Sequence, residues 1–315
     1  MKEILTFGRY LKSRFKTKVS KVPISIEGFT CPNIDGKKAR GGCSYCQNES
    51  FSPNISSKNE FKLNNNSQNH HLDYQLKMLE DEYRSYSRFL KNDRDAKKFI
   101  TYFQSFSNTY APVNTLRALY TRALEFEDCV GLSIGTRADC VDSEKLDLLE
   151  EMSQVSEIWI EYGVQSVHNV TLEKINRAEK IEDIKKVVID SKKRGLKVCV
   201  HLIFGLPDES DEMMLESVKE VYALGIDSIK FHPLYVVENT KLAKQYKNRE
   251  FETISKKRYI DLLIQSLKLL PEGISVQRVS AGVDEKMLIS PQWCRNKNSF
   301  MAELRQILVK NGIIY

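Results

Sequence analysis

Residues 129–162 read CVGLSIGTRADCVDSEKLDLLEEMSQVSEIWIEY. This stretch contains an apolar run (Cys129–Gly135), an amphipathic segment (Ser143–Met152) and a second apolar run (Glu157–Tyr162). Short apolar runs rich in β-branched and aromatic residues predict buried strands, and the amphipathic segment between them predicts a connecting helix. A strand–helix–strand unit of this kind indicates an α/β fold with a parallel sheet.

The same alternation continues along the chain on both sides. Further strands are predicted at Val22–Glu27, Lys98–Gln104, Lys197–Phe204 and Ser228–Pro233, and further helices at Leu72–Leu90, Pro112–Phe126, Ile181–Arg194 and Ser210–Leu224. Six such units form an open barrel or a wound sheet in one long domain. Between the first strand and the first helix, residues 52–71 are rich in Asn and Ser and predict a flexible loop.

The C-terminal part departs from this regular alternation. From about Lys241 it contains a helix pattern (Phe251–Leu269), a strand pattern (Ile274–Val279) and a final helix pattern (Ser299–Lys310). We expect this part to close the barrel edge or to cover its mouth.

Composition and charge limit the location and the partners of the chain. No apolar run approaches the ~20 residues of a membrane span, and residues 1–10 lack the apolar core of a signal peptide, so we expect a cytoplasmic protein without a membrane partner. The net charge is +6, yet residues 1–40 alone carry ten Lys/Arg against three acidic residues. A basic segment of this kind fits a polyanion such as RNA, or it serves only as a solvated arm.

Three of the seven cysteines form a C-x11-C-x2-C pattern directly after the first predicted strand: Cys31, Cys43 and Cys46. Thiolates at such a loop spacing bind a soft metal or an iron–sulfur cluster. Structural zinc needs a fourth ligand, and no further Cys or His occurs before residue 70. Three thiolates leave one iron of a cubane cluster open, as a catalytic site requires. Glycines at 36, 41 and 42 allow close backbone approach. The alternative is three unrelated buried thiols.

The segment CPNIDGKKARGGCSYCQNESF (Cys31–Phe51) resembles the cluster loop of the radical S-adenosylmethionine (SAM) family. More narrowly, it resembles the YhcC-like (MnmL-like) branch, which is related to the elongator catalytic subunit and to oxygen-independent coproporphyrinogen oxidases. Further segments resemble family motifs in the family order: KFITYFQSFSNTYAPV (Lys98–Val113), SIGTRADC (Ser133–Cys140), EYGVQS (Glu161–Ser166), INR (Ile175–Arg177), HLIFGLPDES (His201–Ser210), IKFHPLYVVENT (Ile229–Thr240) and SPQWCRNK (Ser290–Lys297).

This resemblance implies a partial (β/α)6 TIM-like barrel of the radical SAM type. The barrel would span residues 23–240, after a basic N-terminal arm (1–22) and before a small α/β C-terminal extension (241–315). The implied cofactors are a [4Fe–4S] cluster on the three cysteines and SAM on its open iron. Matched positions imply these cofactor contacts: Tyr45, Gln104, Asn108, Gln165, Arg177 and His201. A permanently charged guanidinium such as that of Arg177 suits a carboxylate.

The resemblance also implies an activity and partners. The enzyme would cleave SAM reductively to a 5′-deoxyadenosyl radical, with an electron donor such as flavodoxin or ferredoxin. The implied substrate is a wobble uridine of tRNA, converted from the 5-carboxymethylaminomethyl towards the 5-aminomethyl form. The alternatives are a radical SAM enzyme for a small molecule and a non-catalytic iron–sulfur or SAM-binding sensor.

Some residues depart from the family pattern or allow two interpretations. Ala178 and Glu179 stand where the family commonly has Gly-His, and Asp208 replaces a Gly. Glu161 would lie near the cofactor or would balance a buried Arg such as Arg137. Cys294 would be a buried thiol or an additional hydrogen donor that reaches the site from the tail.

Overall fold

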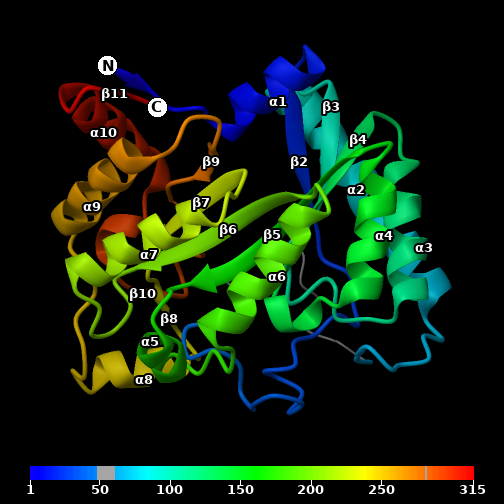
Figure 1. The fold of residues 1–315 in the computed structure, drawn as a ribbon, viewed down its shortest axis with the longest axis horizontal. Coiled ribbons are helices and arrows are strands. Elements are labelled where there is room, and N and C mark those ends of the chain that lie inside the picture. The colour runs from blue at the N-terminus through cyan, green and yellow to red at the C-terminus, as the bar shows by residue number, and fades with distance from the viewer. Residues whose placement is uncertain (48–60, 281) are drawn as a thin grey trace.

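The computed structural model of the chain describes residues 1–47, 61–280 and 282–315. Its centre is a seven-stranded sheet in which all neighbouring strands are parallel. In spatial order the strands are β2 (Val19–Ile24), β3 (Lys98–Phe103), β4 (Cys129–Thr136), β5 (Glu157–Gln165), β6 (Lys197–Phe204), β7 (Ser228–Pro233) and β9 (Ser275–Arg278). The spatial order follows the chain order, and the sheet curls into a half-barrel with helices on its outside (Figure 1). The predicted α/β half-barrel is confirmed, and β9 adds a seventh strand.

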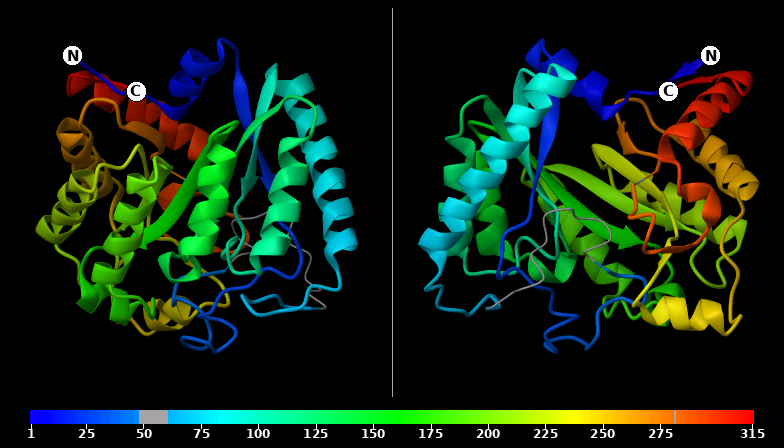
Figure 2. Two further views of the ribbon diagram at one scale, coloured as in Figure 1. Left: turned by 45° about the vertical axis from the view of Figure 1, so that its right-hand side comes forward. Right: turned by 180° about the vertical axis from the view of Figure 1, so that it is seen from behind.

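Helices of the repeated units cover the outer face of the sheet (Figure 2). They are α2 (Leu72–Arg94), α3 (Val113–Leu124), α4 (Ser143–Ser153), α5 (Asn169–Lys174), α6 (Ile181–Lys193) and α7 (Asp211–Ala223). Local capping sets their starts, because the side chains of Asp142 and Ser210 accept hydrogen bonds from backbone amides in the first turns of α4 and α7. The first strand begins at Val19 rather than at the predicted Val22.

Residues 1–18 pack on the amino-terminal end of the half-barrel. β1 (Lys2–Glu3) pairs in parallel with β11 (Ile313–Ile314), and helix α1 (Phe7–Phe15) follows. The buried ring of Phe7 meets Trp159 of β5 edge-on, with a centroid distance of 5.0 Å. The segment predicted as a basic arm therefore contains a packed helix and the start of β2.

The C-terminal part surrounds the open edge of the half-barrel. Its elements besides β9 and β11 are β8 (Val236–Val237), α8 (Lys241–Lys247), α9 (Lys256–Leu269), β10 (Leu288–Ser290) and α10 (Lys297–Lys310). β10 pairs antiparallel with β8, and α9 packs against α7. A bridge between Thr6 and Val276 ties the N-terminal segment to β9. Both ends of the chain therefore meet at this edge.

Two further sequence predictions concern loops and membranes. Of the predicted flexible loop, residues 61–71 are described and contain neither helix nor strand, and residues 52–60 lie outside the described part of the chain. Within the described residues, none of the helices has the length and apolar character needed to cross a membrane.

Candidate active site at the carboxyl end of the half-barrel

The three clustered cysteines share one cavity. Cys31, Cys43 and Cys46 line a space of about 720 Å³ that also contacts the carboxyl-terminal parts of the sheet strands. In parallel α/β barrels this end of the strands is where active sites form. The loop that carries the cysteines follows β2, and the Cys46 amide donates to the Cys43 carbonyl at 3.0 Å.

Three glycines with positive φ allow the cysteine loop to turn. Gly36, Gly41 and Gly42 have φ angles of 92°, 80° and 74°, in the left-handed region that favours glycine. The Gly42 amide donates to the Asn33 carbonyl at 2.8 Å, and the Asn33 side-chain amide lies 3.5 Å from the Cys43 sulfur. The glycine spacing in the sequence therefore serves to fold the loop around its sulfur atoms.

Burial raises the pKa of two of the thiols, Cys31 and Cys46. It raises the pKa of Cys46 to about 12, and the neighbouring Cys43 and Cys31 act in the same direction. Burial also raises the pKa of Cys31, although the charge of Arg137 opposes it. The cavity thus presents three soft sulfur donors, one buried and two partly exposed, which is a donor set that suits an iron–sulfur cluster. The residues present fit this cofactor.

Two buried arginines lie beside the sulfur atoms. Arg137 makes a bidentate ion pair with Asp139, at 2.8 Å for both bonds, and also approaches Glu179 at 3.3 Å. Arg177 pairs with Glu179 at 2.8 Å, and its Nη1 lies 3.8 Å from the Cys43 sulfur. Within the described residues, Arg137 Nη1 and Arg177 Nε have no hydrogen-bond partner. These donors therefore remain available for an anionic group in the cavity.

Most residues that the sequence suggests as cofactor contacts line the same cavity: Tyr45, Gln104, Gln165, Arg177 and His201. Gln165 ends β5 at a φ of 70°, and its amide packs so tightly on Gly163 that a Cβ there would lie 2.6 Å from it. Asn108 is different. It is buried behind the cavity wall, and its side-chain amide donates to the Gly135 carbonyl at 2.9 Å. The structure therefore places Asn108 as a support of the turn after β3 and not in the lining.

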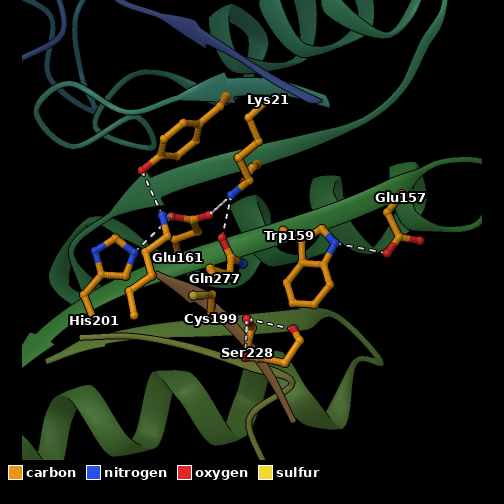
Figure 3. A network of polar contacts seen from close by, with 12 residues as sticks. Lys21, Glu157, Trp159, Glu161, Cys199, His201, Ser228 and Gln277 are labelled. Atoms are coloured by element: carbon orange, nitrogen blue, oxygen red, sulfur yellow. Dashed lines mark hydrogen bonds and ion pairs between the residues drawn. The ribbon is translucent and has the colours of Figure 1, made fainter. Parts of the chain in front are cut away.

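A charged network adjoins the cavity (Figure 3), and two of its members, Glu161 and His201, line that cavity. The fully buried carboxylate of Glu161 contacts the Lys21 ammonium at 2.5 Å and the His201 imidazole at 2.9 Å, and it also pairs with Lys230. Ser133 donates to the same carboxylate at 2.5 Å. These partners come from β2, β4, β6 and β7, so the network connects five strands of the half-barrel.

Electrostatics fixes the charge states in this network. Burial would raise the pKa of Glu161, but Lys21, Lys230 and His201 outweigh burial and hold the pKa well below its usual range. Burial lowers the pKa of His201 to about 4, so the imidazole is neutral at pH 7. The expectation that Glu161 balances Arg137 is wrong, because the carboxylate partners of Arg137 are Asp139 and Glu179.

Two residues of this network lie outside the candidate site residues that the sequence suggests. Lys21 belongs to the basic segment for which the sequence leaves RNA contact or a solvated arm open, and Lys230 stands within a predicted strand. The available signal was a lone cation in an otherwise apolar strand pattern, as in SIKFHP (Ser228–Pro233). Cys294 lies in an apolar cluster with Tyr235 and Leu288 and does not line the cavity, so the structure gives it no contact with the site.

Comparisons with known proteins agree with this geometry. The Radical SAM superfamily matches residues 36–221, and the Radical_SAM C-terminal domain matches residues 226–310. An uncharacterized protein of Methanocaldococcus jannaschii is 36% identical over an alignment that covers 97% of this chain and 89% of that protein. Protein YhcC of Escherichia coli is 33% identical over an alignment that covers 98% of this chain and 93% of that protein.

Other similarities cover part of a longer protein. The tRNA uridine(34) acetyltransferase of Methanocaldococcus infernus is 29% identical over 165 residues, which are 51% of this chain and 30% of that protein. Among solved structures, the archaeal Elp3 of Methanocaldococcus infernus superposes with a TM-score of 0.66 at 18% identity, over 93% of this chain and 63% of that one. The shared fold and the family matches lead to one conclusion. This chain belongs to the radical SAM superfamily, and it is an enzyme of the class that binds a [4Fe–4S] cluster and SAM.

Proposed function

We propose that Cys31, Cys43 and Cys46 hold the [4Fe–4S] cluster of this enzyme and leave one iron for SAM. The observation that carries the proposal is the convergence of the three sulfur atoms on a single cavity beside a buried guanidinium. When bound, the reduced cluster and SAM supply a 5′-deoxyadenosyl radical that abstracts hydrogen from a substrate. An electron donor such as flavodoxin or ferredoxin is part of this proposal.

The protein's own side chains bind and orient SAM. Arg177 offers an Nε–H without a partner among the described residues, so we assign to it the carboxylate of SAM. Gln165 would contact the ribose, and Gln104 would face the methionyl amino group from the end of β3. His201 is neutral and therefore adds no charge near the sulfonium. Asn108 would act on the turn that holds Gln104, through its bond to the Gly135 carbonyl.

We propose tRNA as the substrate, with conversion of wobble 5-carboxymethylaminomethyluridine towards the 5-aminomethyl form. A relative that is named as a tRNA uridine(34) acetyltransferase is 29% identical in sequence over about half of this chain. Exposed cations lie on the cysteine loop and on the adjoining helix α8, and we call them the rim cations: Lys37, Lys38, Arg40, Lys241 and Lys244. The two segments are in contact, because the Leu242 amide donates to the Ser44 carbonyl at 2.9 Å. Phosphate groups at this rim would be attracted to the mouth of the cavity.

The basic N-terminal segment divides between two ends of the molecule. Helix α1, with Lys12 exposed on it and Lys16 exposed at its C-cap, lies at the opposite end from the cysteine loop (Figure 1). Lys21 lies inside the half-barrel. RNA contact at the site is therefore assigned to the rim cations and not to α1.

Nucleoside analysis tests the substrate. Deletion of the gene is expected to change the tRNA nucleosides measured by mass spectrometry, with 5-carboxymethylaminomethyluridine accumulating at the expense of the 5-aminomethyl form. An unchanged nucleoside profile would contradict the tRNA proposal. Formation of 5′-deoxyadenosine without any RNA binding would favour a small-molecule substrate, and absence of that product from the reduced protein with SAM would favour a sensor.

The salt dependence of RNA affinity tests whether the rim cations bind RNA. A variant with Lys37→Gln, Lys38→Gln and Arg40→Gln removes up to three phosphate contacts, so the slope of log affinity against log salt should become shallower by about 2–3. The matched control replaces Lys12 and Arg14 of α1 and the C-cap residue Lys16 by glutamine, with the same change in charge, and should leave the slope unchanged. Equal effects of the two variants would contradict the assignment of RNA to the rim.

A further inference from the structure

A second chamber adjoins the cofactor cavity. It has a volume of about 900 Å³ and shares with that cavity the side chains of Tyr45, Tyr102, Gln104, Gln165 and His201. Its remaining walls come mainly from the ends of β6, β7 and β9: Ile203, His232, Leu234, Tyr235 and Arg278. Because the shared side chains stand between the two spaces, a group in the second chamber would lie next to a bound cofactor. This position suits the substrate.

Arg278 is the charged residue of this chamber. Among the described residues that line it, no other Arg, Lys, Asp or Glu occurs. Arg278 is partly buried, and within residues 1–47, 61–280 and 282–315 its guanidinium forms neither an ion pair nor a hydrogen bond. Most partly buried arginines are paired, because removing an unpaired charge from water is unfavourable. An unpaired guanidinium in a chamber therefore points to an anionic ligand.

The network below the chamber does not supply the missing anion. The single carboxylate of Glu161 is already engaged by Lys21 and Lys230, and burial lowers the pKa of both lysines. Burial lowers the pKa of His232 well below its usual range, and the charge of Arg278 lowers it further. The histidine is therefore neutral at pH 7 and adds no charge. Neither the network nor His232 thus supplies an anion for Arg278.

We infer that the second chamber binds a carboxylate group of the substrate through Arg278. A single planar guanidinium offers two parallel N–H donors, which match the two oxygens of a carboxylate. The other lining side chains carry no charge at pH 7. Aromatic and apolar ones such as Tyr102, Tyr235 and Ile203 stand beside polar ones such as Gln104 and Gln165, and this mixture suits a small organic anion better than a hydrated phosphate. The inference rests on the proposed function for the identity of the substrate, since the side chain of 5-carboxymethylaminomethyluridine ends in such a carboxylate.

Ligand-dependent stability tests this inference without turnover. The cluster-loaded protein is unfolded by heat, without air, in N-acetylglycine at pH 7, in its neutral isostere N-acetylglycinamide, in inorganic phosphate and in chloride at equal ionic strength. At about ten times its Kd, N-acetylglycine should raise the Tm of the wild type by about 2–4 °C relative to chloride. The amide and phosphate should not do so.

Variants locate the effect. Arg278→Gln should remove the Tm increase caused by N-acetylglycine. Arg278→Lys keeps the charge but loses the two parallel N–H donors, so it should retain part of the Tm increase. Arg88→Gln is the matched control on the exposed face of α2 and should retain the full shift. An equal shift with the amide or with phosphate, no shift in the wild type, or an unaltered shift in Arg278→Gln would overturn the inference.

This test and the nucleoside test can fail separately. If N-acetylglycine produces no shift while tRNA from a deletion strain is altered, the carboxylate site is wrong and the tRNA proposal stands. If the shift depends on Arg278 while tRNA is unaltered, the carboxylate site stands and the substrate is a different carboxylate.

Discussion

Replacing Glu161 by glutamine keeps the shape of the side chain but removes the one negative charge from the network of the half-barrel. Glu161 is fully buried, Lys230 is 2% exposed and Lys21 is 19% exposed, so bulk water compensates poorly for the lost carboxylate. Burial already lowers the pKa of both lysines, and without Glu161 their ammonium groups would have only neutral partners. Removing one partner of a buried ion pair costs about 3–5 kcal/mol, and we expect a loss of unfolding free energy in this range.

The assay is urea unfolding of the cluster-loaded protein at pH 7 without air. The control is Glu220→Gln, which breaks a partly exposed pair with Lys185 on the outer helices and should cost about 1 kcal/mol. The folded-state pKa of Glu161 is depressed, so its contribution is complete above the unfolded pKa of about 4.3 and is lost as the pH falls below it. A loss in Glu161→Gln no larger than that of the control would refute this interpretation of the network.

Two further predictions concern backbone strain and pH. Ala178 has a φ of 55°, so Ala178→Gly should raise the unfolding free energy measured in urea by about 1 kcal/mol. The control Ala302→Gly, at an exposed position of helix α10, should lower the unfolding free energy by about as much. A lower unfolding free energy in both variants would contradict backbone strain at Ala178. The pKa of His201 is about 4 in the folded protein and about 6.5 in the unfolded chain, so between these pH values the imidazole takes up a proton only on unfolding. Lowering the pH from about 6.5 to 4 should therefore lower the unfolding free energy. His201→Gln should reduce this fall in thermal unfolding measured across that window, and an identical pH profile would contradict the buried neutral imidazole.

Local patterns in the sequence were sufficient for the regular elements. Strands β6 and β7 have the predicted bounds, because their apolar runs are long and are bounded by glycine and proline punctuation. Cys31, Cys43 and Cys46 line the same cavity, as their spacing on one loop predicts. Helix α5, with six residues, and strand β9, with four, are too short for periodicity to mark their ends.

Partnerships across the sheet could not be predicted in the same way. Whether Lys21 is solvated or buried depends on its pairing with β3 and on the approach of β5, which is a matter of sheet register and not of local sequence. Arg278 is likewise a residue of a short strand whose position is set by β7. The backbone explains why the family commonly has glycine at two positions where this chain has Ala178 and Asp208. Both residues adopt positive φ, at 55° and 65°, where glycine is the residue with least strain.

Anaerobic spectroscopy of the purified protein, with and without SAM, tests the three-cysteine cluster itself. We predict equal amounts of iron and sulfide, a cluster signal that changes when SAM is added, and 5′-deoxyadenosine after reduction with dithionite. Cys43→Ala should lose both the cluster absorbance and the product, whereas Cys294→Ala, outside the cavity lining, should keep both. Zinc in place of iron, or an unaltered cluster in Cys43→Ala, would contradict the proposed site.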